Sequence, residues 1–170
     1  MSWQCWSTSL RYHAGMDSAL EEGLERFQGA LSAHFGSDLI TLAVFGSQVL
    51  GTARPESDLD LLLVVRGLPA RRLDRQGVVL SIAHEVSDAF AERVSMIPLT
   101  PEEAPAIRPF YLGLLEGHRI VVDRNGFLDK ILDRLRRRLA ELGARRLTDE
   151  LGNPYWDLKP DYVLGEDVVL

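Results

Sequence analysis

Two short apolar runs constrain the fold of this chain more than any other feature. They are LITLAVF, residues 39–45, and DLDLLLVV, residues 58–65. Neither run alternates polar with apolar residues beyond its ends, so each predicts a strand that is covered on both faces. Strands of this kind need helices packed against the sheet. The sequence therefore predicts an α/β (α+β) fold, in which a mixed sheet is packed with helices.

Helical periodicity predicts the elements that cover this sheet. Apolar residues recur every three to four positions in several segments, and Asp17 can cap the first of them. The expected helices lie at residues 17–35, from Pro69 to about Phe90, within 109–117 and at 126–142, and further strands at 93–99 and 119–123. Residues 100–104 (TPEEA) resemble a helix start. The first two strands can run antiparallel or parallel, because only about a dozen residues join them.

The composition limits the classes of partner and cofactor. The chain carries a formal net charge of -6, so it repels a polyanion and we expect no stable binding of long nucleic acid. The one cysteine, Cys5, excludes an internal disulfide, and the four histidines show no metal-ligand spacing. No run is long and apolar enough to suggest a membrane span, and residues 1–15 lack the pattern of a secretory signal. We therefore expect a cytoplasmic protein.

The second apolar run opens with two acidic residues. Asp58 and Asp60 follow the pair Gly46-Ser47 after a ten-residue spacer. Alternation along a strand places both carboxylates on one face, with their Cα atoms roughly 6.6 Å apart. Carboxylates at this spacing can share two Mg²⁺ ions, which is the usual arrangement for an in-line displacement at phosphorus. Bound cations would also offset the unfavourable free energy of placing carboxylates beside a hydrophobic core.

Gly46 and Ser47 fit the other half of such a site. Glycine lets the backbone approach a ligand closely, and a helical turn after it offers free N–H groups to a phosphate. The Ser47 hydroxyl adds one more donor. The motif therefore predicts a triphosphate at Gly46 and Ser47 and metal ions at Asp58 and Asp60. The alternative is that Gly46-Ser47 only makes a turn and that the aspartates only cap a strand.

The stretch GSQVLGTARPESDLDLLLVV resembles the signature of the nucleotidyltransferase superfamily with a DNA polymerase β-like catalytic core. It is most similar to the minimal nucleotidyltransferases, the small antitoxin partners of HEPN toxins, and the resemblance covers roughly residues 20–122. It implies a polymerase β-like fold, Mg²⁺ on the catalytic residues Asp58 and Asp60, and the phosphates of ATP or another NTP at Gly46 and Ser47. It also implies transfer of a nucleoside monophosphate to a hydroxyl. Antitoxins of this kind place AMP on a tyrosine of the toxin and silence its ribonuclease activity.

Two positions depart from the pattern of this family. Leu50 stands where relatives carry an arginine, and Arg54 either supplies that charge or is solvated. Ser95 stands where relatives carry a third carboxylate, in the strand after the long helix. A serine cannot act as a general base and is a poor Mg²⁺ ligand. The acids that either reach in from the preceding helix or stay solvated are Glu85, Asp88 and Glu92.

The predicted elements and the range of the resemblance divide the chain into three parts. Residues 1–15 are expected to be a loose N-terminal extension, 16–124 the nucleotidyltransferase core, and 125–170 a C-terminal helix with an extended tail that packs on the core or on a partner. The aromatic residues of the tail either cover the domain's own apolar surface or dock a partner. The arginines at 136–138 are either solvated or form a surface for an anion or an acidic partner. The aromatic residues in question are Tyr155, Trp156 and Tyr162.

Three hypotheses of function follow. The first is a Mg²⁺-dependent nucleotidyltransferase that moves AMP from ATP to a hydroxyl of a partner protein, acting as an antitoxin on a small helical HEPN-type toxin. The second, motivated by Ser95, is a catalytically weak or inactive module that neutralises such a partner by occlusion. The third is transfer to a small molecule, as in aminoglycoside-modifying relatives. The third is disfavoured because the chain shows no second domain to form a substrate cleft.

Overall fold

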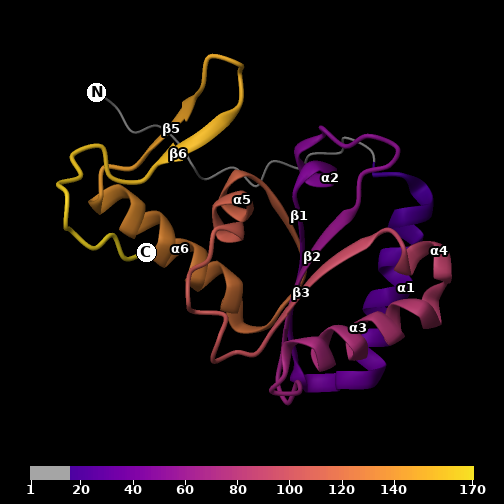
Figure 1. Cartoon of the computed structure of the whole chain (residues 1–170). Helices are drawn as coiled ribbons and strands as arrows, with labels where there is room; N and C mark the ends of the chain where they lie inside the picture. Colours follow the sequence, from indigo (N-terminus) through magenta and orange to yellow (C-terminus); the bar gives the residue numbers. More distant parts are fainter. Residues whose placement is uncertain (1–15) are drawn as a thin grey trace.

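The computed structural model describes residues 16–170, so the expected N-terminal extension lies outside the described residues. At its centre is a four-stranded sheet with the strand order β3-β2-β1-β4 (Figure 1). The strands are β1 (Leu39–Phe45), β2 (Leu59–Val65), β3 (Val94–Leu99) and β4 (His118–Asp123). Each lies within one residue of the range that the apolar pattern predicts.

The sheet is mixed, as the sequence predicts. β1 pairs antiparallel with both β2 and β4, whereas β2 pairs parallel with β3. Of the two options for the first two strands, the antiparallel one is therefore correct. The connection between them holds only the short helix α2 (Ser47–Leu50) and a loop, which suffices to reverse the chain. The chain passes from β2 to β3 through two helices, which is the crossover that parallel strands require.

One face of the sheet is covered by α1 (Ser18–Phe35), α3 (Arg72–Val86) and α4 (Asp88–Ala91), on the right in Figure 1. α1 begins after Asp17, whose carboxylate accepts a hydrogen bond from the N–H of Ala19 at 3.1 Å. Its apolar stripe and that of α3 pack on alternate residues of β2. The buried members of this layer include Leu24, Phe27, Leu31, Leu59, Leu61, Val79 and Phe90.

The other face is covered by α5 (Phe110–Glu116) and α6 (Phe127–Glu141), on the left in Figure 1. The buried residues here include Ala43, Phe45, Leu62, Val64, Tyr111, Leu128, Leu132 and Leu135. Two short 3₁₀ turns, Gly36–Asp38 and Arg124–Gly126, precede β1 and α6. Because β1 and β2 contribute buried side chains to both layers, the expectation of doubly covered strands is confirmed.

The helix expected from Pro69 is shorter than its apolar stripe suggests. α3 begins at Arg72 and ends at Val86. Ser87 then adopts an extended conformation, and its hydroxyl accepts a hydrogen bond from the N–H of Phe90 at 3.1 Å. Ser87 therefore caps a separate turn of helix, so Phe90 reaches the core from α4.

The helix start expected at residues 100–104 is wrong, because this segment forms turns. Glu103 does accept a hydrogen bond from the N–H of Thr100, at 3.2 Å, as a capping residue would. Its carboxylate is also held by the guanidinium of Arg75 on α3. Pro105 disfavours helical backbone at the residue before it, so the turn is not continued as a helix.

The C-terminal tail is not simply extended, which corrects the expectation for its first half. Strands β5 (Arg145–Thr148) and β6 (Pro154–Asp157) form a two-stranded antiparallel hairpin. The carboxylate of Asp149 accepts hydrogen bonds from the N–H groups of Leu151, at 2.9 Å, and Asn153, at 2.7 Å, and so closes the turn. This local hydrogen bonding has no counterpart in an apolar pattern.

Part of the C-terminal tail packs on the domain, and one of the arginines at 136–138 binds the tail. Trp156 packs against the layer of α5 and α6, whereas Tyr155 and Tyr162 are about half exposed. Arg138 donates a hydrogen bond to the carbonyl of Val169 at 2.9 Å.

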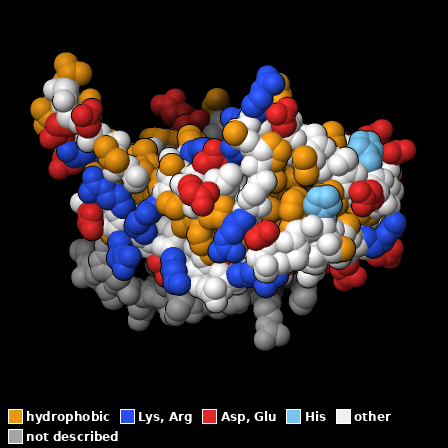
Figure 2. Space-filling view, turned by 90° about the horizontal axis from the view of Figure 1, so that it is seen from below, with side chains coloured by type: hydrophobic (Ala, Val, Ile, Leu, Met, Phe, Trp, Pro, Cys, Tyr) orange, Lys and Arg blue, Asp and Glu red, His pale blue; other side chains and the backbone are white. Residues whose placement is uncertain are grey.

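Among residues 16–170, no helix combines the length and apolar character of a bilayer span. Figure 2 shows charged side chains of both signs mixed with exposed apolar side chains on one face of the molecule.

Candidate functional site

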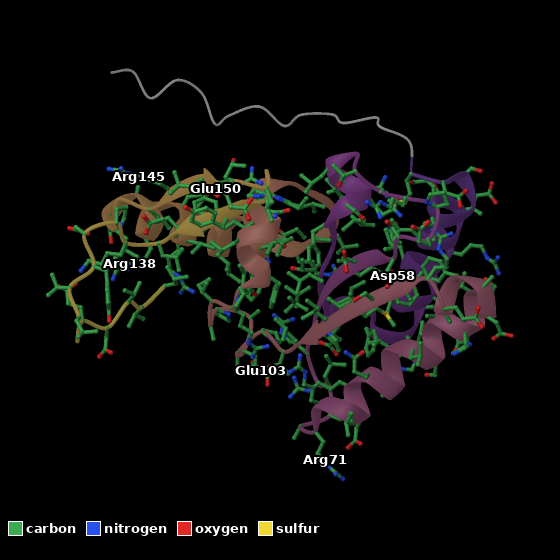
Figure 3. The ribbon with its side chains drawn as sticks, turned by 45° about the horizontal axis from the view of Figure 1, so that its top comes forward. Asp58, Arg71, Glu103, Arg138, Arg145 and Glu150 are labelled. Carbon is green, nitrogen blue, oxygen red and sulfur yellow. The ribbon has the colours of Figure 1, made fainter. Side chains whose placement is uncertain are left out.

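The two halves of the Gly-Ser and aspartate motif meet at one end of the sheet. Phe45, the last residue of β1, pairs with Asp60 of β2, and Asp60 pairs with Ser95 of β3. Phe45 also pairs with His118 at the start of β4. Since paired residues project to the same face of a sheet, these four residues form one row on the face that α5 and α6 cover. Asp58 lies just before β2, beside the strands in Figure 3.

Gly46 is in direct contact with Asp60. Gly46 has φ 75° and ψ -155°, a backbone conformation that is essentially restricted to glycine. A Cβ atom built on it would lie 2.3 Å from Oδ2 of Asp60, well inside any normal contact. The carboxylate of Asp60 therefore rests against the Gly46 backbone. The structure thus brings together two predicted site residues that are fourteen positions apart in the sequence.

Ser47 begins α2, so the predicted helical turn after the glycine is present. The carbonyl of Gly46 accepts hydrogen bonds from the N–H groups of Val49 and Leu50, both at 3.1 Å. The N–H groups at the very start of a helix have no acceptor within it. Ser47 is therefore placed where its hydroxyl and the nearby amides can donate to an anion beside Asp60, and its role in nucleotide binding stays a prediction.

The electrostatics of Asp60 favour a cation. Burial raises the pKa of Asp60 above its ordinary value, the hydrogen bond with the Ser95 hydroxyl works against this rise, and the charge of Asp58 adds to it. Asp58 itself is exposed. Two carboxylates that repel each other at the edge of a core are stabilised by a divalent cation. Mg²⁺ needs only one or two protein carboxylates when water and phosphate oxygens complete its shell. Asp58 and Asp60 therefore fit a Mg²⁺ site shared with a nucleotide.

A third acidic ligand is absent from the described part of the chain. No group of three histidine, cysteine or acidic side chains in residues 16–170 is arranged to hold a metal ion. Ser95 occupies the position across from Asp60. The three acids considered as substitutes are exposed on α3, on α4 or just after α4, and these helices cover the opposite face from Asp60. They are Glu85, Asp88 and Glu92.

The arginine position of the family has no clear substitute. Leu50 is 39% exposed and packs near Gly117, the residue before β4. Arg54 is exposed in the loop between α2 and β2, where its N–H donates to the hydroxyl of Ser57 at 2.9 Å. The loop therefore leaves the Arg54 guanidinium in solvent, and the first of its two expected roles has no support from the described contacts.

Three residues near the site were missed by sequence reasoning. Gln48 of α2 is buried, and Arg93 directly precedes β3. Both donate hydrogen bonds to the carbonyl of Ser57, next to Asp58. Nδ1 of His118 lies 2.8 Å from the carbonyl of Leu114, at the end of α5. No periodic pattern marks their roles, because the hydrogen bonds of Gln48 and Arg93 and the strand pairing of His118 join segments distant in the sequence.

Comparison with known proteins identifies the family of the chain. A family described as "Nucleotidyltransferase domain" matches residues 24–160. A relative from Methanocaldococcus jannaschii, named "Putative protein adenylyltransferase MJ1305", is 34% identical over 122 residues, which are 71% of this chain and 83% of the relative.

Two solved structures are more distant. A chain from the complex of the tri-AMPylated Shewanella oneidensis HEPN toxin with MNT antitoxin has a TM-score of 0.47 and 13% identity, and covers 73% of this chain and 92% of its own. Spectinomycin adenyltransferase from Enterococcus faecialis has a TM-score of 0.46 and 14% identity, and covers 72% of this chain and 66% of its own. At such TM-scores a structural likeness does not indicate a shared function.

The family match and the relative confirm the resemblance seen in the motif. The family match spans more than half of the chain, and the identity to the relative exceeds 30% over most of both proteins. With the mixed sheet and its flanking helices, they confirm the polymerase β-like nucleotidyltransferase fold. The chain belongs to the family of proteins with a nucleotidyltransferase domain.

Proposed function

We propose that this nucleotidyltransferase moves AMP from ATP to a hydroxyl group of a partner protein, with Mg²⁺ at Asp58 and Asp60 and the triphosphate at Gly46 and Ser47. The observation that carries the proposal is the contact between the Gly46 backbone and the Asp60 carboxylate. A phosphate bound on the turn after Gly46 would therefore lie next to the carboxylates that we propose as metal ligands. A phosphate and a divalent cation can then share ligands in one place.

The reaction would proceed as an in-line displacement. The acceptor oxygen forms a bond to the α-phosphorus of ATP, the bond from that phosphorus to the bridging oxygen breaks, and pyrophosphate leaves with the bond electrons. Bound Mg²⁺ would neutralise the charge that develops on the phosphate oxygens. Gly46 admits the triphosphate to the backbone, and Ser47 donates a hydrogen bond to it. Asp58 and Asp60 orient the cation. The hydroxyl proton must go to water or to a phosphate oxygen, because Ser95 is not a base.

A protein acceptor is supported by the relative at 34% identity, whose name describes a protein adenylyltransferase. The resemblance of the motif to the minimal nucleotidyltransferases narrows the proposed acceptor to a small helical HEPN-type toxin and the proposed role to that of an antitoxin. ATP as the nucleotide follows from the same two likenesses.

Labelled ATP tests this proposal. The chain, Mg²⁺ and the candidate toxin should give labelled toxin, and Asp58→Ala or Asp60→Ala should abolish the label. Asp74→Ala is the matched control, because Asp74 is an exposed acid in the first turn of α3 and should leave labelling unchanged. Absence of label with any of the four NTPs would contradict transfer to this protein.

A second candidate function is supported by Ser95, which stands across from Asp60 where a third carboxylate is expected. On this alternative the chain is catalytically weak or inactive and neutralises the toxin by occlusion. Asp60→Asn separates the two, because it keeps the shape of the side chain but removes its charge. Cells protected from the toxin by the Asp60→Asn variant would favour occlusion, and loss of protection would favour transfer.

A further inference from the structure

The carbonyl oxygen of Ser57, the residue directly before Asp58, accepts two side-chain hydrogen bonds. Nε2 of Gln48 donates one at 3.2 Å, and Nη2 of Arg93 donates the other at 3.1 Å. Gln48 belongs to α2, which opens the predicted phosphate-binding turn, and Arg93 directly precedes β3. A single carbonyl therefore joins α2, the loop before Asp58 and the start of β3.

Arg93 holds the backbone on both sides of Asp58. Its side chain binds the carbonyl of Ser57, and its own main-chain carbonyl accepts the N–H of Leu59 at 2.8 Å. Its guanidinium is anchored in turn by the carboxylate of Asp17, whose oxygen lies 3.6 Å from Nη1. Asp58 is exposed between these two fixed peptide groups. The direction in which its carboxylate projects is therefore set by neighbours that do not touch that carboxylate.

Gln48 is buried, so its side-chain amide depends on the hydrogen bond to Ser57 for a partner. Gln48 is only 7% exposed and is one of three buried polar or charged residues in the described chain. A buried amide that loses its hydrogen-bond partner destabilises the fold. An apolar residue of the same size could fill the same space, but it would leave the Ser57 carbonyl with one donor instead of two.

We propose that Gln48 and Arg93 are positioning residues for Asp58, and that they raise the affinity of the site for a divalent metal by fixing the Ser57 peptide. This inference rests on the proposed function, because it takes Asp58 to be a metal ligand. Groups that orient a metal-binding carboxylate typically change metal affinity by roughly 10-fold to 100-fold when they are removed.

The probe is Mn²⁺, whose free ion is counted by electron paramagnetic resonance, in the presence of a non-hydrolysable ATP analogue. Gln48→Leu and Arg93→Met should each raise the Kd for Mn²⁺ by about tenfold or more. Arg93→Lys keeps one donor and should restore much of the affinity. The matched control is Arg124→Met, because Arg124 donates to the carbonyls of Leu39, at 2.6 Å, and Gly36, at 2.9 Å, at the far end of β1. Arg124→Met should lower the thermal midpoint of unfolding without changing the Kd for Mn²⁺.

The outcomes separate this inference from the function on which it rests. If Asp58→Asn loses Mn²⁺ but folded Gln48→Leu and Arg93→Met bind it like the wild type, only the positioning role is overturned. If the wild type binds no Mn²⁺, or if Asp58→Asn binds it equally well, the metal site and this inference fall together. Should Arg93→Met not fold, Gln48→Leu and Arg93→Lys decide the outcome by the same Kd.

Discussion

Replacing Gly46 with alanine perturbs the site at its most constrained point. Two separate effects are expected in the Gly46→Ala variant. The backbone must hold a non-glycine residue at φ 75° and ψ -155°, which costs about 1–3 kcal/mol. The new Cβ would also lie 2.3 Å from Oδ2 of Asp60, whereas real Cβ contacts below 3.0 Å essentially do not occur. The carboxylate or the strand end must therefore move by about 0.7 Å.

These distances set the expected magnitudes. A backbone term of about 2 kcal/mol lowers the thermal midpoint of a chain of this size by about 4–8 °C. A displacement approaching 1 Å in a group that positions reactants can reduce the rate by about 100-fold. Gly46→Ala should therefore unfold at a lower temperature and transfer AMP roughly two orders of magnitude more slowly. Thermal unfolding of the metal-free protein and the initial rate of label transfer measure the two effects.

A double-mutant cycle isolates the contact from the backbone strain. In an Asp60→Ala background the carboxylate is gone, so Gly46→Ala should cost only the backbone part. The coupling in the free energy of unfolding should fall in the range of about 0.5–3 kcal/mol that contacting residues show. Gly67→Ala is the matched control, because Gly67 has φ 73° but no atom within 4 Å of an added Cβ. It should lose stability and keep the transfer rate.

Three results would refute this reasoning. The first is a Gly46→Ala variant with the wild-type free energy of unfolding. The second is a stability loss that is as large with Asp60→Ala as without it. The third is a Gly67→Ala variant that slows transfer as much as Gly46→Ala does, because the rate would then report general stability and not the position of Asp60.

Three further predictions concern charge. Asp60→Asn should stabilise the metal-free protein at pH 7. The folded state raises the pKa of Asp60 above its ordinary value of 3.8, so ionisation of this carboxyl group at higher pH destabilises the fold. Thermal unfolding should show this gain shrinking as the pH falls below about 4 and with added Mg²⁺. Glu103→Gln should lose about 1–3 kcal/mol in urea unfolding at pH 7, since it removes the negative charge that pairs with the buried Arg75 guanidinium. Arg75 lowers the pKa of Glu103 below 4.5, so wild type and variant should converge as acid protonates Glu103. Ser95→Asp should speed label transfer by about 100-fold or more if a missing base limits the rate, and an unchanged rate contradicts that limit.

The layers of the fold could be predicted because the strands are apolar on both faces. β1 occupies the predicted residues, and β2 begins at Leu59, one residue later than expected. The antiparallel direction of the first pair could not be predicted, because a connection of about a dozen residues allows either direction. The direction depends on how α2 and its loop fold back, and buried Gln48 contributes to that through a contact nine residues away.

Other features could not be predicted because they depend on contacts between distant segments. Thr100 and Glu103 have the spacing of a helix start, but Glu103 is also drawn into an ion pair with Arg75 on another helix. The hairpin of β5 and β6 is exposed along β5, so no apolar alternation marks that strand. The hairpin is held to the domain by Trp156, which is partly buried against the layer of α5 and α6, and by an ion pair of 2.9 Å between Arg146 and Glu116. None of these pairings follows from local periodicity.

The position of the candidate site follows from the register of β1 and β2. Leu59 and Leu61 are buried in the layer of α1 and α3, so Asp60 between them must face the opposite layer. A slip of one residue would turn Asp60 toward the layer of α1 and α3 and bring both leucines to the edge where the candidate site lies. The hydrophobic free energy of leucine burial opposes that slip by about 1.5–3 kcal/mol for each side chain. The apolar residues that alternate with the two aspartates therefore determine which face the Asp60 carboxylate occupies, and the contact with Gly46 depends on them.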